Sequence, residues 1–540
     1  MESDRRTLAV RACVACRKQK RKCTREVPEC SLCSKNGRPC EYPVGSRAAS
    51  NPDDHSRVAP RIQNPTVMPV QTVDSAVTTP SSNEPTAPRL LPVENHFPLF
   101  FLDSSYFQHT NSLLQMPTIE LPPEFDSIGA QSNMHDVDVY FNSIHTFLPI
   151  VSKLRLYREL SAPQNCRNPD TALLLITIQL HTRSLDSSDP PNRELYGLAK
   201  ACCSHVERSN IFSIRLLQAT LLITLYEIAN AIYPAAYLSV GHCMRLGHAI
   251  GIHDFKRAPQ MLRTPTSATE LEERRRVWWA VIVLDRYVNV GGKHRPFSCD
   301  DVRPDELLPM DDKHWDQGEL ALVQPLAVST NTTVKICPFG RTCQASHLLS
   351  RVLRHISDRD SDIEFRCNEA LQLRRTLQAL AATIANESEE LLGHVNDATA
   401  DLPLFTATAL CHSALLGLYE TYCCTENSEA NQMGCENLLE MQSLAISGLK
   451  EISNAVFLFS KRLQAVTELG GMLRMTPLVC ACLYQAAGNY LWYTLETGGQ
   501  DYLSKANTIK SVLSILGTRW NSAREYVAIL DGVDYSGIHN

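Results

Sequence analysis

Six cysteines near the start of the chain have the residue type and spacing of metal ligands. The pattern Cys-x2-Cys-x6-Cys occurs twice, and its members are Cys13, Cys16, Cys23, Cys30, Cys33 and Cys40. A CxxC pair lets two thiolates reach one metal ion from a tight turn, and a third thiolate can return from the end of a short helix. Each half of the repeat therefore offers three sulfur ligands to an ion such as zinc.

The number of thiols predicts how two zinc ions would be held. A structural zinc site takes four ligands, so two ions need eight ligand positions from six thiols. Six thiolates fill eight ligand positions if two of them each bridge both ions. The symmetry of the repeat selects Cys13 and Cys30 as the bridging pair. Such a cluster has no open coordination position and is structural, not catalytic. Since about 30 residues bury too little apolar surface to fold alone, the metal would supply the folding free energy.

Other uses of six cysteines fit this segment less well. A disulfide framework is typical of secreted chains, and residues 1–6 do not resemble a secretory signal. A redox CxxC pair needs a βαβ context, which is absent from the pattern around these cysteines. Two separate mononuclear sites would need eight ligands, and the segment contains no histidine.

Charge is distributed unevenly along the chain. Residues 1–47 hold 12 Lys and Arg against 5 Asp and Glu, a net charge of +7, while the remainder carries −13. Six of the basic residues lie between Cys16 and Cys30, namely Arg17, Lys18, Lys20, Arg21, Lys22 and Arg25. Such a run can be a solvated face or a nuclear-localisation patch. On a scaffold built by metal, it indicates a surface that faces the phosphates of double-stranded DNA.

The segment from Arg11 to Tyr42 resembles the fungal Zn2Cys6 binuclear cluster family, in its cysteine spacing and in Arg17, Lys20, Lys22, Pro28, Lys35, Gly37 and Tyr42. The resemblance implies two Zn2+ ions and two short helices related by a pseudo-twofold axis. It also implies that Lys20 contacts the guanines of a CGG triplet, because lysine donates to the O6 and N7 atoms that guanine presents in the major groove. Arg17, Lys18, Lys22 and Arg25 are expected to contact phosphates. Gln19 departs from the family, which usually has Arg or Lys there, and leaves the flanking-base preference open.

A linker and a large helical region are expected to follow the cluster. Residues 51–100 contain nine prolines, where the chain average gives about three, and much of the rest is polar. This composition predicts disorder. Further on, the apolar stripes of Leu217, Leu221, Leu225 and Ile228, and of Leu438, Met441, Ala445, Leu449, Ile452 and Val456, have helical spacing. The predicted fold class is a small Zn2Cys6 cluster, a disordered Pro/Ser/Thr linker and a large all-α regulatory domain.

Residues 136–310 resemble the fungal-specific transcription factor domain. The matching stretches are 140–141, 145–150, 218–219, 225–226, 244–253, 274–279, 284–286 and 295–296. With both resemblances, the expected organisation is a basic tail (1–10), a DNA-binding domain (11–44), a mostly disordered linker (45–135), the fungal transcription factor domain (136–342) and a further helical region (343–540). We expect an irregular stretch near residues 297–342, which contain four prolines.

Several residues of the helical region could bind DNA or a metal ion, but structural roles are favoured for them. Arg274–Arg276 are expected to pair with Glu272, Glu273 or Asp285 beside Trp278 and Trp279, and not to bind DNA. His145, His248 and His253 lie among apolar residues without a metal-ligand pattern, so we expect core or surface histidines. The other 14 cysteines are scattered and are expected to be buried free thiols. The alternating acidic and apolar residues 525–535 fit either an activation segment or a last helix.

The function predicted from these patterns is sequence-specific DNA binding by a nuclear transcription factor of RNA polymerase II genes. We expect an activator, not an enzyme, that acts with the transcription machinery and regulates a secondary-metabolite gene cluster. A regulator of nutrient use and a corepressor whose zinc module binds protein are the alternatives. No apolar heptads follow the cluster, so monomeric binding or a homodimer formed through the helical domain is expected. The sequence shows no membrane-spanning stretch of about 18 apolar residues.

Overall fold

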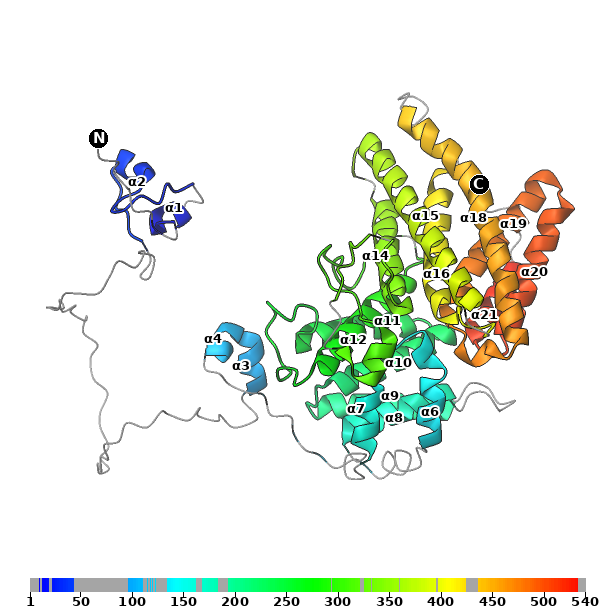
Figure 1. The fold of residues 1–540 in the computed structure, drawn as a ribbon, viewed down its shortest axis with the longest axis horizontal. Helices are drawn as coiled ribbons and strands as arrows, with labels where there is room; N and C mark the ends of the chain where they lie inside the picture. The colour runs from blue at the N-terminus through cyan, green and yellow to red at the C-terminus, as the bar shows by residue number, and fades with distance from the viewer. Residues whose placement is uncertain are drawn as a thin grey trace. The chain divides into compact units, whose positions relative to one another are not determined.

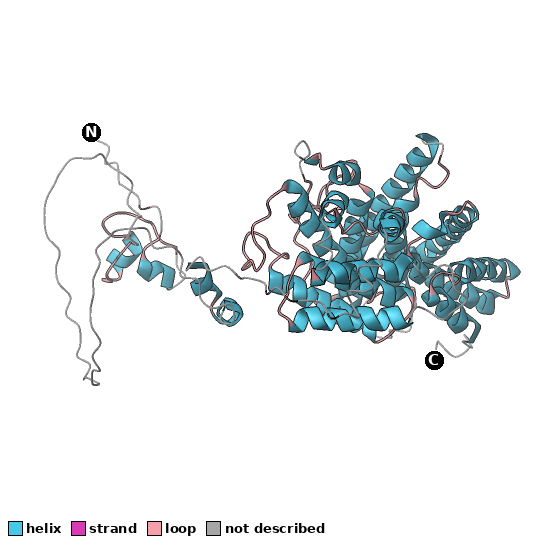
Figure 2. Cartoon of the chain, turned by 90° about the horizontal axis from the view of Figure 1, so that it is seen from below, coloured by secondary structure: helices cyan, strands magenta, loops and turns pink. Residues whose placement is uncertain are grey.

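The structure is a computed structural model of the 540-residue chain. It describes Ala9, Leu114, Pro117, Ile119, Pro122 and residues 12–18, 22–42, 96–109, 134–161, 168–182, 193–292, 294–320, 325–331, 333–358, 360–394, 397–423 and 436–532. These residues belong to two compact units, Met1–Pro85 and Thr86–Asn540. Among them helices and loops are the only elements, apart from a bridge between Leu307 and Ala327 and a bridge residue at Glu26 (Figure 2).

The first unit contains two single-turn helices that each begin beside a cysteine. Helix α1 (Val14–Lys18) begins directly after Cys13, and α2 (Ser31–Lys35) begins directly after Cys30. Among the described residues of this unit, the buried ones are four cysteines and Ala9. Because this core consists largely of sulfur, apolar packing contributes little to the stability of the unit.

In the N-terminal half of the second unit, several helices pack around α10 (Figure 1). Its elements are α3 (His96–Leu102), α4 (Ser104–His109), α6 (Met134–Phe141), η2 (Ile144–Thr146), α7 (Lys153–Leu160), α8 (Pro169–Thr182), α9 (Arg193–Arg208), α10 (Ile214–Ala229), α11 (Ala235–Ile250) and α12 (Ala268–Tyr287). The predicted stripe on α10 is confirmed, since Leu217, Leu221, Leu225 and Ile228 are all buried. Every residue of α10 except Ile214 is in fact buried, because α8, α9, α11 and α12 surround the helix.

The C-terminal half is a bundle that includes the two longest described helices. Its elements are α13 (Asp312–Gln317), α14 (Pro338–Ser357), α15 (Ile363–His394), η6 (Leu402–Leu404), α16 (Phe405–Tyr422), α18 (Glu436–Glu468), η7 (Gly471–Arg474), η8 (Pro477–Val479), α19 (Cys480–Thr497), α20 (Gln500–Leu516) and α21 (Asn521–Gly532). The stripe predicted on α18 faces the core, with Met441, Ala445 and Val456 fully buried. One continuous core joins both halves.

Two features of the fold differ from the predicted organisation. Residues 96–109 were expected to belong to a disordered linker, but they form α3 and α4, because a Phe- and Leu-rich segment supplies apolar side chains. Phe100 and Phe107 are buried, and the ring of Phe97 packs edge-on against Phe212 at 5.7 Å. The boundary predicted between residues 342 and 343 falls inside α14, so it does not separate two structural units.

The predicted irregular stretch is largely confirmed. Between α12 and α14 the only described α-helix is α13, and Pro304 and Pro309 lie outside helices. Pro338, which was assigned to the irregular stretch, is instead the first residue of α14. Proline is favoured at a first helical position because the missing N–H has no intrahelical partner there anyway.

Ion pairs hold the arginines of α12 inside the protein, as predicted. Arg276 is fully buried and pairs with Glu272 at 3.0 Å and with Asp312 at 2.6 Å. Arg274 is also buried and pairs with Glu270 at 2.8 Å. These side chains therefore fix α12 against α13 and the preceding loop and are not available to DNA.

The chain end and the remaining thiols also have structural roles. The segment from Asn521 to Gly532 forms α21, whose Leu530 is buried and whose Tyr526 ring stacks on Tyr484 at 4.6 Å, while residues 533–535 lie outside the described residues. Among the described cysteines of this unit, nine are buried and two are half-buried. Burial raises the pKa of Cys243 and of Cys411 to about 12, so both stay protonated at neutral pH.

One described segment, Leu402–Tyr422, is long and apolar enough to cross a membrane by length and composition. In the structure, 83% of its apolar window is buried, and α16 packs against α14, α15, α18 and α19. Its hydropathy is that of a helix in the middle of a protein core.

Candidate zinc and DNA-binding site

The six cysteine sulfurs of the first unit lie within reach of common metal positions. One group of mutually close sulfurs comprises Cys13, Cys16, Cys23 and Cys30, and the other comprises Cys13, Cys30, Cys33 and Cys40. Within each group every pair of sulfurs is at most 4.8 Å apart. Cys13 and Cys30 belong to both groups and are fully buried.

The sulfur–sulfur distances fit tetrahedral zinc. Cys13 Sγ lies 3.8 Å from Cys30 Sγ and 3.7 Å from Cys33 Sγ, and Cys16 Sγ lies 3.8 Å from Cys30 Sγ. A regular tetrahedron with Zn–S bonds of ~2.3 Å has edges of about 3.8 Å. The Cys13–Cys30 and Cys13–Cys33 pairs of one sulfur group, and the Cys16–Cys30 pair of the other, are therefore at the separation of two ligands on one zinc ion.

The electrostatics of the thiol cluster also call for cations. Burial acts to raise the pKa of Cys30, but hydrogen bonds from the Cys33 backbone and neighbouring thiols outweigh it and lower the pKa to about 6. Burial raises the pKa of Cys16 to about 12. The protein alone thus stabilises some thiolates at the expense of others, and six adjacent thiolates need the charge of divalent ions.

Local hydrogen bonds close the domain around the sulfurs. The backbone N–H of Cys30 donates to Cys40 Sγ at 3.2 Å, and the N–H of Cys16 donates to Cys13 Sγ at 3.5 Å. The N–H of Val14 donates to the Glu41 carbonyl at 2.8 Å, which joins the first helix to the end of the domain.

Two tethers were not predicted from the sequence. The Tyr42 hydroxyl donates to the Glu26 carbonyl at 2.7 Å. Thr24 Oγ1 accepts from the Ser31 N–H at 2.9 Å, at the start of α2. In the sequence, Tyr42 was identified only as part of the family pattern. Hydrogen bonds of the Tyr42 and Thr24 hydroxyl groups to the backbone follow no spacing rule, so the sequence does not predict them.

The predicted DNA-contact residues are only partly within the described chain. Arg17 on α1 and Lys22 and Arg25 after it are exposed. Lys20 lies outside the described residues, and so does the side chain of Lys18. The exposed residues are consistent with a basic surface around the first half of the cluster, where a polyanion would bind.

Comparison with known proteins identifies both units. The model of the fungal Zn(2)-Cys(6) binuclear cluster domain matches residues 11–49, and that of the fungal specific transcription factor domain matches residues 137–382. The transcription factor BOA15 of Botryotinia fuckeliana is 37% identical over 33% of this chain and 98% of its own length.

Two further relatives are more distant. The depudecin biosynthesis cluster-specific transcription activator DEP6 of Alternaria brassicicola is 25% identical, over 33% of this chain and 30% of its own length. The tropolone cluster transcription factor tropK of Talaromyces stipitatus is 24% identical, over 65% of this chain and 67% of its own length. With its six cysteines arranged for two zinc ions, the chain belongs to the fungal Zn2Cys6 transcription factors and is a DNA-binding regulator of transcription.

Proposed function

We propose that this transcription factor reads a CGG-type triplet, with Lys20 donating to guanine and with Arg17, Lys18, Lys22 and Arg25 contacting phosphates. The observation that carries the proposal is the exposure of Arg17, Lys22 and Arg25 beside the thiol cluster. Helix α1 is held at Cys13 and ends at Lys18, two residues before Lys20, while Arg17 and Lys22 are exposed on either side. A lysine that follows a rigid helix end can enter the major groove, where guanine O6 and N7 accept.

We propose, too, that all six cysteines bind the two zinc ions and that Cys13 and Cys30 bridge them. Their membership of both sulfur groups supports this assignment, as does their complete burial. Bridging leaves each ion with four sulfur ligands and no open position, so the ions shape the domain and take no part in a reaction.

The biological setting belongs to the same proposal. We place the protein in the nucleus, as an activator of RNA polymerase II genes of a secondary-metabolite cluster. Its similarity to DEP6, a cluster-specific activator, and to tropK, a tropolone cluster factor, supports this setting. The helical domain would act by binding, without catalysis, and would contact the transcription machinery.

A homodimer formed through the helical domain is proposed for the full chain. The lack of apolar heptads after the cluster supports this location over a coiled coil. Sedimentation of the full chain, with and without a duplex carrying two CGG triplets, measures the stoichiometry. A single chain on each such duplex at saturation would contradict the dimer.

Substitution of Lys20 and Lys22 separates base reading from phosphate contact. In the zinc-loaded full chain, Lys20→Ala should weaken binding to CGG by about 1–3 kcal/mol and relax the preference at that base step. Lys22→Ala should weaken binding to all sequences alike and reduce the slope of log affinity against log salt by about one. Fluorescence anisotropy with CGG and scrambled duplexes over a salt series measures both effects. If the two variants behave identically on both duplexes, the assignment of a reader and an anchor is wrong.

A further inference from the structure

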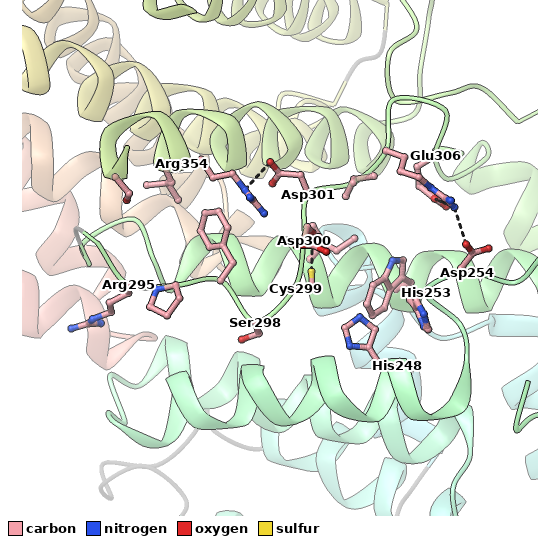
Figure 3. Close-up of a pocket in the computed structure, with 18 of the residues that line it drawn as sticks. His248, His253, Asp254, Arg295, Ser298, Cys299, Asp300, Asp301, Glu306 and Arg354 are labelled. Carbon is pink, nitrogen blue, oxygen red and sulfur yellow. Dashed lines mark hydrogen bonds and ion pairs between the residues drawn. The ribbon is translucent and has the colours of Figure 1, made fainter. Parts of the chain in front are cut away.

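An open hollow of about 960 Å³ lies in the helical unit, at the junction of α11, α12 and α14 (Figure 3). Its walls come from the end of α11, from α12, from the end of α14 and from the loop of residues 294–306. Pockets for small organic molecules have volumes of about 300–1,000 Å³, so the hollow is large enough for one. It uses stretches 244–253 and 295–296, which the DNA-reading function leaves unexplained.

One corner of the hollow is made of three flat rings. The rings of His248 and His253 meet edge to face with centroids 4.6 Å apart, and their centroids lie 5.3 and 5.9 Å from that of Trp278. Gly247 permits this arrangement, because a Cβ there would come within 2.8 Å of the Trp278 ring. Such a corner favours a flat ligand, since aromatic rings pack well edge to face or offset-stacked.

The imidazoles of this corner are neutral hydrogen-bonding groups. Burial lowers the pKa of His248 and of His253, so both rings are uncharged at neutral pH. The ring nitrogens of His248 make no hydrogen bond within the described part of the chain. A neutral imidazole offers one N–H donor and one nitrogen acceptor, which suits a hydroxyl group.

The opposite wall is held in place before any ligand arrives. Two guanidinium groups lie near the ring of Phe297, that of Arg286 at 4.2 Å and that of Arg354 at 5.5 Å from its centroid. The N–H of Ser298 donates to Asp285 Oδ1 at 3.3 Å. A preformed wall lowers the ordering cost of binding.

The charges of the hollow argue against an anionic ligand. Its lining contains three arginines and five carboxylates, a formal net charge of −2 from these groups alone. Arg354 pairs with Asp301 at 2.8 Å, and Arg303 pairs with Asp254 at 3.2 Å. Two of the arginines are thus already neutralised, and the third, Arg295, lies over the Tyr237 ring at 5.6 Å.

From this geometry we infer that the hollow is a binding site for an uncharged, flat, hydroxyl-bearing aromatic molecule. The ring of the ligand lies in the corner of Trp278, and its hydroxyl bonds to His248. The site belongs to the helical unit and does not depend on how the zinc unit reads DNA.

Equilibrium dialysis of the zinc-loaded full chain with four naphthalene probes tests the inference. The uncharged 2-naphthol should bind more tightly than naphthalene, 2-naphthoate or 2-(aminomethyl)naphthalene. One hydrogen bond corresponds to a factor of roughly 2 to 12 in affinity. His248→Phe keeps a flat ring without nitrogen, so it should reduce 2-naphthol binding by about that factor and leave naphthalene binding unchanged.

His242→Phe is the matched control. His242 lies on the same helix, pairs with Glu207 and does not line the hollow, so this variant should bind 2-naphthol like the wild type. An equal loss of 2-naphthol affinity in both variants would show that the probe does not bind at His248. Circular dichroism shows whether each variant remains helical. Equal affinity for 2-naphthol and naphthalene would overturn hydroxyl recognition. Tightest binding of the ammonium probe, weakened by Asp300→Asn, would assign the hollow to cations instead.

Discussion

Cys13 and Cys30 illustrate how single residues replace a hydrophobic core in the zinc unit. Each is fully buried, and each lies among sulfurs of both halves of the repeat. The apolar residues that pack on this sulfur cluster are few and only partly buried. The folding free energy of the unit must therefore come from metal–sulfur bonds.

Replacement of Cys13 tests the bridging assignment. Cys13→Ala removes a ligand from both sulfur groups, so the variant should lose both zinc ions and specific DNA binding. Cys23→Ala is the matched control, because Cys23 belongs to one sulfur group only. This variant should bind one zinc ion more weakly and keep all four sulfur ligands of the other ion. Native mass spectrometry counts zinc ions per chain. Two ions retained by the Cys13 variant would refute the bridge.

Helix α12 shows how an element is fixed by buried charge. Besides its carboxylate partners, the Arg276 guanidinium donates to the Met310 carbonyl at 2.6 Å and lies 4.1 Å from the Trp315 ring. Burial disfavours the charged form, but Asp312 and Glu272 outweigh it and raise the pKa of Arg276. The ion pairs and the ring contact together orient α13 against α12.

Removal of this charge should destabilise the helical unit strongly. Arg276→Met removes the buried guanidinium shared by Glu272 and Asp312, while Glu272 keeps Arg275 and the Met310 N–H as partners, so we expect a loss of about 1.5–3 kcal/mol in the free energy of unfolding. Urea unfolding followed by circular dichroism measures it. Arg245→Met, on the exposed face of α11, should change stability by less than about 0.5 kcal/mol. Similar midpoints for the two variants would show that the buried pairs do not stabilise α12.

Sequence patterns predicted long helices better than short ones. The stripes of α10 and α18 repeat over several turns, so their burial followed from periodicity. Helices α3 and α4 have seven and six residues, too few for a periodic signal, and a proline-rich neighbourhood hid them. Pro338 suggested an interruption because a proline that begins a helix and one that breaks a helix look alike in sequence.

The same contrast holds for the sites. The zinc site could be predicted because its ligands lie within 28 residues and obey a spacing rule. The hollow could not, since His248, Trp278, Phe297 and Arg354 come from segments that only the tertiary packing brings together. The histidines of stretch 244–253 were expected to be core or surface residues, and the structure adds that two of them line a pocket.

At the scale of the whole molecule, buried histidines make stability depend on pH. Burial lowers the pKa of His412 to about 4, against about 6.5 in an unfolded chain. The unfolded state takes up a proton as the pH falls below about 6.5, whereas the folded state stays neutral until about pH 4. Stability is therefore complete above pH 6.5 and is lost between pH 6.5 and 4, by about 2 kcal/mol at pH 5 for this residue.

Urea unfolding at pH 7 and pH 5 measures this loss. The wild type should lose stability between the two values, and His412→Gln, which cannot take up the proton, should lose about 2 kcal/mol less. His242→Gln is the comparison variant, because the Glu207 carboxylate raises the pKa of His242 instead of lowering it. Its loss of stability between pH 7 and pH 5 should not be smaller than that of the wild type. An unchanged pH dependence in His412→Gln would mean that His412 is accessible to protons in the folded protein.

Sequence-specific DNA binding through the zinc unit is the central claim, and one titration tests it most directly. Fluorescence anisotropy of the zinc-loaded full chain would be measured on a duplex with CGG triplets, on a scrambled duplex, and after zinc chelation, each over a salt series. We predict tighter binding to CGG, affinity that falls steeply with salt, and loss of binding with the zinc. Equal affinity for the two duplexes, or CGG binding that survives chelation, would contradict the account.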